Sequence, residues 1–521
     1  MNYAVFIPVA GLGTRLKSLT KNLNKCLIDI NNTPNISHII NNFNKNVDFV
    51  IAIGHKGELV KEYLKLTYPK RNFKFVKIKN YKGKNSGLGL TIFKCKKFLQ
   101  RPFIFIPGDT YFRKKIKNIS FNWVGYKSGN SQQYRKVKTQ NFDLIDLLDK
   151  KNRSSKKIYS GIFAVKDYKD FWKNCKINNE KFIKNGESYV LKEFLKKKIQ
   201  IKILKIDWQD IGNLKSLAIT RRLHNKNFIN ILEKENEKIW FVKDKVIKFN
   251  TDRSFIKKRY KRSIILKNFV PKIISKSNNF YVYKKVKGKI ISKVLSKSLF
   301  LNLLNRCKIL WNKKLKKQNI TNKKFKKNCK LFYKDKTIER VSMFLKKNKL
   351  SDNYSYINNV KIPNIETLLK NIDWNYLSNG KKSIIHGDLH FENILYSKGK
   401  FTFLDWRQDF ANNLYHGDLY YDLAKLMHGF IVSHKSIVEN KFEVSEYKKK
   451  VKFKINNPII LSRLIKIFNK WIIKEGYDLK KIKILTSLIF LNIACLHHYP
   501  YNKFLFYLGK YELFRSLNDE F

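Results

Sequence analysis

The chain has 521 residues and a formal net charge of +71, from 110 lysines and arginines against 39 aspartates and glutamates. A hydrophobic fraction of 43% excludes a disordered basic tail, and the length exceeds what one core usually serves, so at least two domains are expected. Such a charge is also typical of proteins that bind nucleic acid or an anionic membrane. Lysines are spread along the whole chain, and Asn, Ile, Phe and Tyr are also abundant. The positive charge is therefore explained mainly by codon bias and a solvated surface, with nucleic-acid binding as the minor alternative.

The cysteines and apolar runs predict a cytoplasmic location without a membrane span. The six cysteines include no CxxC pair and no metal-ligand spacing, which favours a reduced protein. The N-terminal MNYAVFIPVAG lacks a basic lead-in and is predicted to be a core strand, not a signal peptide. The apolar run over residues 484–496 is too short and too polar to cross a bilayer, so a buried helix is predicted there.

Up to about residue 220, short apolar runs alternate with helix-like segments. Strands are predicted over residues 3–10, 48–55, 73–80 and 103–109. Helices are predicted over residues 35–43, 57–68 and 87–99. This alternation indicates a parallel α/β sheet with helices on both faces, in which ligands bind at the carboxyl ends of the strands.

The first phosphate-binding candidate is the loop GLGTRL, which follows the first strand and precedes a predicted helix. Gly11 and Gly13 let backbone N–H groups approach a triphosphate, and Arg15 can add a charge-assisted contact. The loop lacks a third glycine at position 16 and a GK[ST] ending. It is therefore neither the dinucleotide fingerprint nor a Walker loop.

Further polar residues follow this loop along the chain. Lys25 is a second cation able to reach the phosphates, and Ser86 and Gly87 belong to a small-residue turn that can pass under a base. Asp109 ends the strand FIFIPGD, and Asp210 lies in WQDIGN after another short strand. Two carboxylates at strand ends can share a Mg²⁺ ion that bridges nucleotide and acceptor phosphates.

Together these residues resemble the sugar-phosphate nucleotidylyltransferase family over roughly the first 220 residues. That family carries a GxGTRL-type loop, a later PK lysine, a GD metal aspartate and a WxDxG aspartate. The resemblance implies roles that we list by residue: nucleotide-phosphate contacts for Gly11, Gly13 and Arg15, a contact at the reacting phosphate for Lys25, the base for Ser86 and Gly87, and Mg²⁺ for Asp109 and Asp210. Asn24 departs from the pattern, because the family usually has proline there.

Two more residues fall where that family contacts the hydroxyls of its acceptor. They are Gly161, in YSGIF, and Glu187, in NGESY. A turn glycine and a surface carboxylate remain the alternative reading of these two positions.

After about residue 220 the pattern changes. A polar stretch carries no strand, and a domain boundary is placed between residues 228 and 229. Residues 239–250 predict a hairpin, and residues 281–288 predict a further strand. From about residue 297 the pattern is mostly helical, so a small sheet followed by a larger helical part is expected.

The stretch SIIHGDLHFENILYSKGKFTFLDW, residues 383–406, holds the second candidate site. Asp388 and Asn393 have the D-x4-N spacing of a kinase catalytic loop, in which the aspartate accepts or orients a hydroxyl proton. Asn393 and Asp405 can hold Mg²⁺, and His386 is expected to support the loop.

This stretch resembles the aminoglycoside phosphotransferase/choline kinase family, whose signature is HGDxxxxN followed by a DW strand. The resemblance covers about residues 230–521 and implies that Lys248, in VIKF, contacts the nucleotide phosphates. The family's helix glutamate has no match in SFIKKRYKRSIIL, and Asp418 and Asp422 are expected to be structural. Residues 331–345 have a helix-like apolar stripe, which core packing explains. The alternative is that Lys336 or Arg340 contacts the substrate.

The two resemblances imply an α/β protein with a Rossmann-like nucleotidyltransferase sheet over residues 1–228 and a two-lobed, protein-kinase-like α+β domain over residues 229–521. A bifunctional enzyme is expected: the kinase phosphorylates a sugar or amino alcohol with ATP, and the first domain joins the product to CTP, UTP or another NTP. Mg²⁺ would serve both steps, for capsule or cell-surface glycan synthesis. The alternatives are a basic nucleic-acid-binding protein on degenerate enzyme folds, or a chain with only one active domain.

Overall fold

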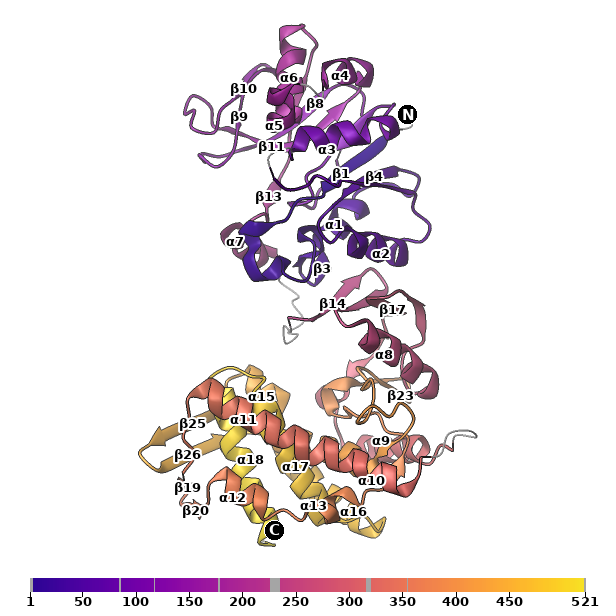
Figure 1. Cartoon of the computed structure of the whole chain (residues 1–521), viewed down its shortest axis with the longest axis vertical. Helices are drawn as coiled ribbons and strands as arrows, with labels where there is room; N and C mark the ends of the chain where they lie inside the picture. The colour runs from indigo at the N-terminus through magenta and orange to yellow at the C-terminus, as the bar shows by residue number, and fades with distance from the viewer. Residues whose placement is uncertain are drawn as a thin grey trace. The chain divides into compact units, whose positions relative to one another are not determined.

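The computed structural model describes residues 3–83, 86–116, 118–176, 179–224, 235–314, 320–353 and 355–519. The chain forms two compact units (Figure 1). Unit 1 comprises Met1–Arg253 and Ile274–Lys285, and unit 2 comprises Ser254–Ile273 and Val286–Phe521. The boundary predicted between residues 228 and 229 falls within residues 225–234, outside the described residues, and stays a prediction.

The main sheet of unit 1 has nine strands. Their order is β5 (Phe73–Lys77), β4 (Asp48–Ile53), β1 (Ala4–Val9), β6 (Phe103–Phe105), β11 (Lys157–Val165), β8 (Trp123–Ser128), β12 (Lys202–Lys205), β10 (Asp143–Leu148) and β9 (Lys136–Gln140). The four strands predicted from the sequence are β1, β4, β5 and β6, and they run parallel. The sheet as a whole is mixed, because β11 pairs antiparallel with β6, β8 and β9. The parallel sheet expected from the sequence is wrong for most of the strands beyond β6, where β8 and β12 are the parallel pair among the described residues.

Helices cover both faces of this sheet, as predicted. The first face carries α1 (Asn35–Asn41) and α2 (Gly57–Thr67), and the second carries α3 (Leu88–Cys95), α4 (Tyr168–Asn174) and α6 (Glu187–Lys196). Along β1, Val5 and Ile7 pack with the first set, and Ala4 and Phe6 with the second. This alternation follows from the two-residue repeat of a strand, so both sides of β1 are apolar. Smaller elements of the unit are β2 (Asp29–Ile30), β3 (Thr33–Pro34), β7 (Thr110–Phe112), β13 (Trp208–Asp210), α5 (Glu180–Asn185) and α7 (Leu214–His224).

Unit 1 also contains the small sheet that follows the predicted boundary. Its strands are β14 (Glu237–Val242), β15 (Lys245–Asn250), β17 (Phe280–Lys284) and β16 (Ile273–Lys276), in that order. The hairpin and the third strand predicted from the sequence are therefore present. Trp240 joins the core of the first face, with its ring centroid 5.4 Å from that of Tyr63 on α2. Glu62 accepts a hydrogen bond of 2.7 Å from Ser277. The small sheet thus buries its apolar face against α2, since a sheet with one apolar face must cover it.

Unit 2 is mainly helical, as the sequence predicts. Its helices are α8 (Arg253–Ile265, in this unit from Ser254), α9 (Lys297–Trp311), α10 (Asn322–Lys330), α11 (Lys336–Asn348), α12 (Ile365–Lys370), α13 (Trp374–Ser378), α14 (Leu419–Ile431), α15 (His434–Val438), α16 (Ile459–Lys474), α17 (Leu479–Ala494) and α18 (Tyr501–Leu517). The buried helix predicted over residues 484–496 is α17, which packs on α14 and α18. Within the described residues, no helix combines the length and apolarity needed to cross a membrane.

The sequence did not predict the strands of unit 2 outside the quoted stretch. A four-stranded sheet has the order β20 (Val360–Ile362), β19 (Ser355–Ile357), β26 (Lys450–Ile455) and β25 (Phe442–Tyr447). Shorter pairs are β18 (Lys289–Ile290) with β22 (Ile394–Ser397) and β23 (Lys400–Phe403), and β21 (Lys382–Ser383) with β24 (Gly417–Asp418). β25 (FEVSEY) and β26 (KVKFKI) alternate apolar and polar side chains, so their sequences do carry the two-residue period of a half-buried strand.

Two candidate active sites

The glycine loop of the first candidate site leaves β1 and turns sharply. Gly13 has φ +69°, and a Cβ atom there would lie 3.0 Å from the Thr20 side chain and 3.2 Å from that of Lys25. A side chain at this position would be strained by the backbone conformation and crowded by these two neighbours. The helix predicted after the loop is a short 3₁₀ segment, Thr14–Thr20, which contains a kink at Lys17 with φ +49°.

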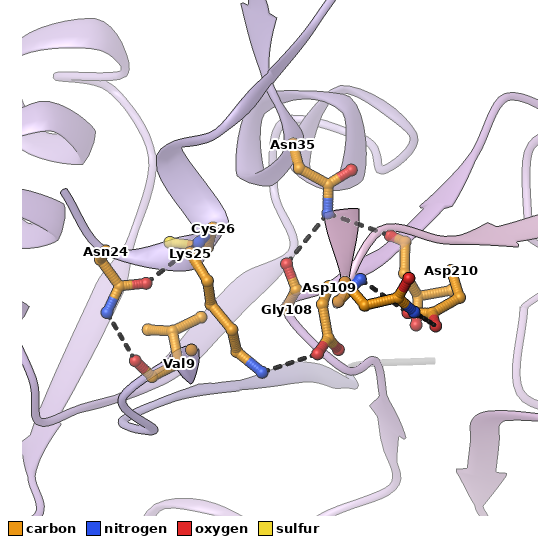
Figure 2. Close-up of polar contacts among 12 residues, drawn as sticks. Val9, Asn24, Lys25, Cys26, Asn35, Gly108, Asp109 and Asp210 are labelled. Atoms are coloured by element: carbon orange, nitrogen blue, oxygen red, sulfur yellow. Dashed lines mark hydrogen bonds and ion pairs between the residues drawn. The ribbon is translucent and has the colours of Figure 1, made fainter. Parts of the chain in front are cut away.

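Lys25 and Asp109 form an ion pair in this site. The Nζ atom of Lys25 lies 2.8 Å from Oδ2 of Asp109, and both side chains keep a small exposed fraction, 19% and 17% (Figure 2). Asn24 holds the lysine in place, because its buried amide donates to the carbonyls of Val9 and His55 at 2.8 and 2.7 Å. Its Oδ1 accepts from the backbone of Cys26. The amide thus links the loop to the ends of β1 and β4.

The two predicted metal aspartates are brought together by strand pairing. β13 runs antiparallel to β7, with Asp210 opposite Thr110, the neighbour of Asp109. A Cβ atom on Gly212 would lie 3.0 Å from each of three atoms: Arg15 Nη2, Asp109 Oδ2 and Asp210 Oδ1. The two carboxylates and the guanidinium therefore converge on one point. Gly212 leaves that point open.

The charges of this site favour an ionised Asp109. Burial alone raises the pKa of this carboxyl, but the Lys25 ion pair and the charge of Arg15 outweigh it and leave the pKa below its ordinary value. Two carboxylates beside an open point fit Mg²⁺, which is held in proteins by one or two carboxylates together with phosphate oxygens.

Sequence reasoning missed two residues that position these aspartates. The buried Asn35 on α1 donates to the carbonyls of Gly108 and Thr110, at 2.9 and 3.2 Å, on either side of Asp109 (Figure 2). The hydroxyl of Tyr134 donates to Asp210 Oδ2 at 3.0 Å. Neither residue belongs to a motif, so only their place in the fold reveals them.

The predicted base-binding turn lies before α3. Ser86 donates to the carbonyl of Gly83 at 2.8 Å, and a Cβ atom on Gly87 would lie 2.3 Å from the carbonyl oxygen of Ile183 on α5. Close packing against α5 therefore accounts for the glycine at position 87. Contact with a base stays a prediction for both residues.

Of the two predicted acceptor residues, Glu187 carries a buried polar atom without a hydrogen-bond partner. Glu187 begins α6, and its Oε2 is buried without a hydrogen bond, as is the hydroxyl of Tyr159 on β11. Burial raises the pKa of Glu187 to about 7. Gly161 lies on β11 with φ +77°, where a side chain would press on Pro107. Glu187 is therefore not the surface carboxylate of the alternative reading.

The second candidate site centres on Asp388, in unit 2. Its Oδ1 lies 2.9 Å from Nζ of Lys425, a buried residue of α14. The amide of Asn393 donates to the Asp388 carbonyl at 3.0 Å and to its Oδ2 at 3.2 Å. Burial raises the pKa of Asp388, but the Lys425 charge, with the nearby His390, leaves it well below the ordinary value. Lys425 was not predicted, because one lysine among many carries no motif.

The loop that carries Asp388 is held from below by Asp422. This buried carboxylate accepts from the backbone N–H groups of His386 and Gly387 at 2.8 and 2.7 Å, and from the Trp311 indole at 3.0 Å. Burial lowers the pKa of His386 to about 3, so its ring is neutral. His386 Nδ1 accepts from the N–H of Asp388 at 3.3 Å, which is the supporting contact expected of it. Asp405 follows β23 and has φ +56°.

Helix α8 binds the same region through a basic residue. The buried Arg262 donates to the carbonyls of Ile385, Arg407 and Leu414. Lys248 lies buried on β15, in unit 1, and its contact with nucleotide phosphates stays a prediction.

Comparison with known proteins gives matches in both the N-terminal and the C-terminal part of the chain. Residues 340–443 match the phosphotransferase enzyme family. The D-glycero-alpha-D-manno-heptose 1-phosphate guanylyltransferase of Campylobacter jejuni is 29% identical over 187 residues, covering 34% of this chain and 82% of the relative. The enzyme with the same name from Aneurinibacillus thermoaerophilus is 27% identical over 218 residues, covering 40% of this chain and 91% of the relative.

Solved structures also match. A glucose-1-phosphate thymidylyltransferase structure from Bacillus anthracis covers 45% of this chain and 98% of its own, with 19% identity and a TM-score of 0.38. The sequence matches and the observed sheets confirm the predicted fold class and the predicted fusion. The chain joins a region similar to nucleotidylyltransferases with a region similar to phosphotransferases, and both halves are of enzyme type.

Proposed function

We propose that the chain is a bifunctional enzyme that phosphorylates a small hydroxylated metabolite and then links the new phosphate to a nucleotide. One observation carries the proposal. Each unit holds an aspartate paired with a lysine at 2.8 or 2.9 Å, within the residues that resemble a known transferase. A kinase produces a phosphorylated acceptor, and a nucleotidylyltransferase uses such a compound as its substrate. The two activities would therefore act in sequence, with the kinase first.

In the kinase step, Asp388 orients the acceptor hydroxyl, whose oxygen attacks the γ-phosphorus of ATP while the bond to ADP breaks. The low pKa of Asp388 favours orientation over proton storage. Asn393 and Asp405 would hold Mg²⁺, which offsets phosphate charge when bound, and Lys248 would contact the α and β phosphates.

In the nucleotidyl step, an oxygen of the acceptor phosphate attacks the α-phosphorus of an NTP, and pyrophosphate leaves. Gly11, Gly13 and Arg15 would cradle the triphosphate, and Lys25 would reach the reacting phosphate. Asp109 and Asp210 would hold Mg²⁺. Ser86 and Gly87 would lie against the base, and Gly161 and Glu187 would bind acceptor hydroxyls.

The guanylyltransferase relatives support a sugar 1-phosphate as the acceptor and make GTP the first nucleotide to test, beside CTP and UTP. A nucleotide-linked sugar of this kind would supply capsule or cell-surface glycan synthesis in the cytoplasm. The alternatives are an amino-alcohol acceptor and a chain with one active centre.

A mass-spectrometric screen tests the proposal. The full chain is incubated with Mg²⁺, ATP, CTP, UTP and GTP against sugars, sugar phosphates and amino alcohols. We expect a phosphorylated acceptor and a nucleotide-linked product. D388N should abolish the first product and leave nucleotidyl transfer to a pre-phosphorylated acceptor. Loss of both products in a folded D388N protein would contradict two separate centres.

A further inference from the structure

Four basic side chains interact electrostatically around Lys336, and one of them, Lys425, forms an ion pair with Asp388. We call them the cationic cluster: Lys336, Arg340, Arg407 and Lys425. Lys336 begins α11 and Arg340 lies one helical turn later, Arg407 lies two residues after Asp405, and Lys425 lies on α14. Among these four residues, Lys425 has a carboxylate partner in Asp388, and the presence of the other three basic side chains has no such explanation.

An aromatic floor holds part of this cluster. The Lys336 Nζ atom lies 4.2 Å from the centroid of the Phe332 ring, and the Arg407 Cζ atom lies 4.6 Å from the same centroid. Lys336 is also 5.8 Å from the ring centroid of Tyr421. Both rings are only 5% exposed, so two cations share a buried support. Ring faces attract cations, but they do not cancel the repulsion between two of them.

Three members of the cluster have no carboxylate partner among the described residues. Within the described ranges, the ion pairs include Lys425 with Asp388 and none that joins a carboxylate to Lys336, Arg340 or Arg407. The Nε atom of Arg407 is buried without a hydrogen-bond partner. Burial lowers the pKa of Lys336, and the charges of Arg407, Lys425 and Arg340 lower it further, against Asp388. Gathered like charges are costly unless a bound anion offsets them.

The two oxygens of Asp388 separate this cluster from the predicted metal ligand. Oδ2 faces the Asn393 amide at 3.2 Å, whereas Oδ1 faces Lys425 at 2.9 Å. Asn393 is the residue that we assign to Mg²⁺ and hence to the nucleotide. Lys425, the member of the cluster that contacts Asp388, therefore binds the oxygen that does not face Asn393. We assign that side of the carboxylate to the hydroxyl-bearing substrate.

We propose that the kinase acceptor carries an anionic group, a phosphate or a carboxylate, which Lys336, Arg340 and Arg407 bind over the Phe332 ring. This inference rests on the proposed kinase function and narrows its substrate class. A hydroxylated acid or a sugar phosphate fits the site. A quaternary amine such as choline does not, because three basic side chains without a carboxylate partner would repel it.

Aldehyde labelling of the full chain tests this inference without needing the true substrate or any kinase turnover. Pyridoxal 5′-phosphate and pyridoxal form the same Schiff base with a lysine and differ by one phosphate. After borohydride trapping and peptide mapping, we expect Lys336 to be labelled at least about tenfold more by the phosphate form, the ratio that 1.4 kcal/mol of anion binding produces. Lys346, exposed on the same helix, is the internal control and should show no such preference.

Variants and a nucleotide analogue complete the test. R340M and R407M should each reduce the preference at Lys336, with folding checked by circular dichroism. Equal labelling by both aldehydes, or no labelling of Lys336, would overturn the proposal. Protection of Lys336 by a non-hydrolysable ATP analogue with Mg²⁺ would assign the cations to the nucleotide and overturn it as well. A failed kinase assay beside a positive labelling result would count against the proposed function alone.

Discussion

In unit 2, the Nζ atom of Lys425 lies 2.9 Å from Oδ1 of Asp388; the lysine side chain is 10% exposed and the aspartate side chain 35%. No sequence motif links them. The pair keeps a carboxylate ionised where a phosphoryl-transfer enzyme needs to orient a hydroxyl.

Replacing Lys425 by methionine should therefore cripple the kinase step. We expect kcat/KM for phosphorylation to fall by about 100-fold or more, the usual effect of removing one fixed charge from an active site. Without Lys425 the pKa of Asp388 rises, so the remaining activity should decline as the pH falls into the acidic range, where the wild type stays flat. A pH–rate profile measures this, and K346M, on an exposed face, is the control. An unchanged profile would contradict the pairing.

Asp109 should matter only for nucleotidyl transfer. In D109N the partner of Lys25 loses its charge, so we expect nucleotide-linked product to fall by about 1,000-fold, since a metal ligand and a fixed charge are both lost. Phosphorylation of the acceptor should stay within twofold of the wild type. D170N, in a solvent-exposed pair with Lys173, is the matched control. Both products are quantified in the same reaction, and a parallel loss of phosphorylation would argue against independent centres.

Glu187 makes the stability of unit 1 depend on pH. Burial raises its pKa from the ordinary 4.5 to about 7. Below pH 4.5 the group is protonated in both states and costs nothing. As the pH rises through 7, the folded state must hold a buried charge, and stability is lost. E187Q avoids this cost, so it should exceed the wild type by up to about 3 kcal/mol at pH 8 and show no gain at pH 4.

Urea unfolding of E187Q at both pH values measures the effect. E180Q, at an exposed position of α5, serves as the control. A gain that is the same at both pH values would exclude titration of Glu187 as the cause. Acceptor binding offers a second readout, because the same variant should raise KM for the phosphorylated acceptor.

Asn24 should contribute to folding as well as to the position of Lys25. Its buried amide makes hydrogen bonds with Val9, His55 and Cys26. At about 0.5–1.5 kcal/mol for each bond, N24A should lower the free energy of unfolding by about 2–4 kcal/mol. N22A, whose amide bonds are exposed to solvent, should change it by less than about 1 kcal/mol. If the two variants lowered the free energy of unfolding equally, the proposed role of Asn24 in folding would be wrong.

Much of the fold could be predicted from local patterns. The parallel strands β1, β4, β5 and β6 follow from apolar runs, and the β14–β15 hairpin from a short polar turn between two such runs. The strands β25 and β26 were missed although their apolar and polar residues alternate, a pattern from which they could have been predicted. Packing also placed the β14–β17 sheet against α2, which no boundary drawn from composition anticipates.

The sequence by itself determined which site residues lie together when they belong to the same loop. Asp388 and Asn393 share one loop, and Gly11, Gly13 and Arg15 share another, so their spacing alone brings their groups near. Only the tertiary structure decided two pairs that lie far apart and that no motif predicts: Asp388 with Lys425, and Lys336 with Arg407. Their separation depends on strand pairing and helix packing. Because the chain has so many lysines, only these contacts show which of them belong to a candidate active site.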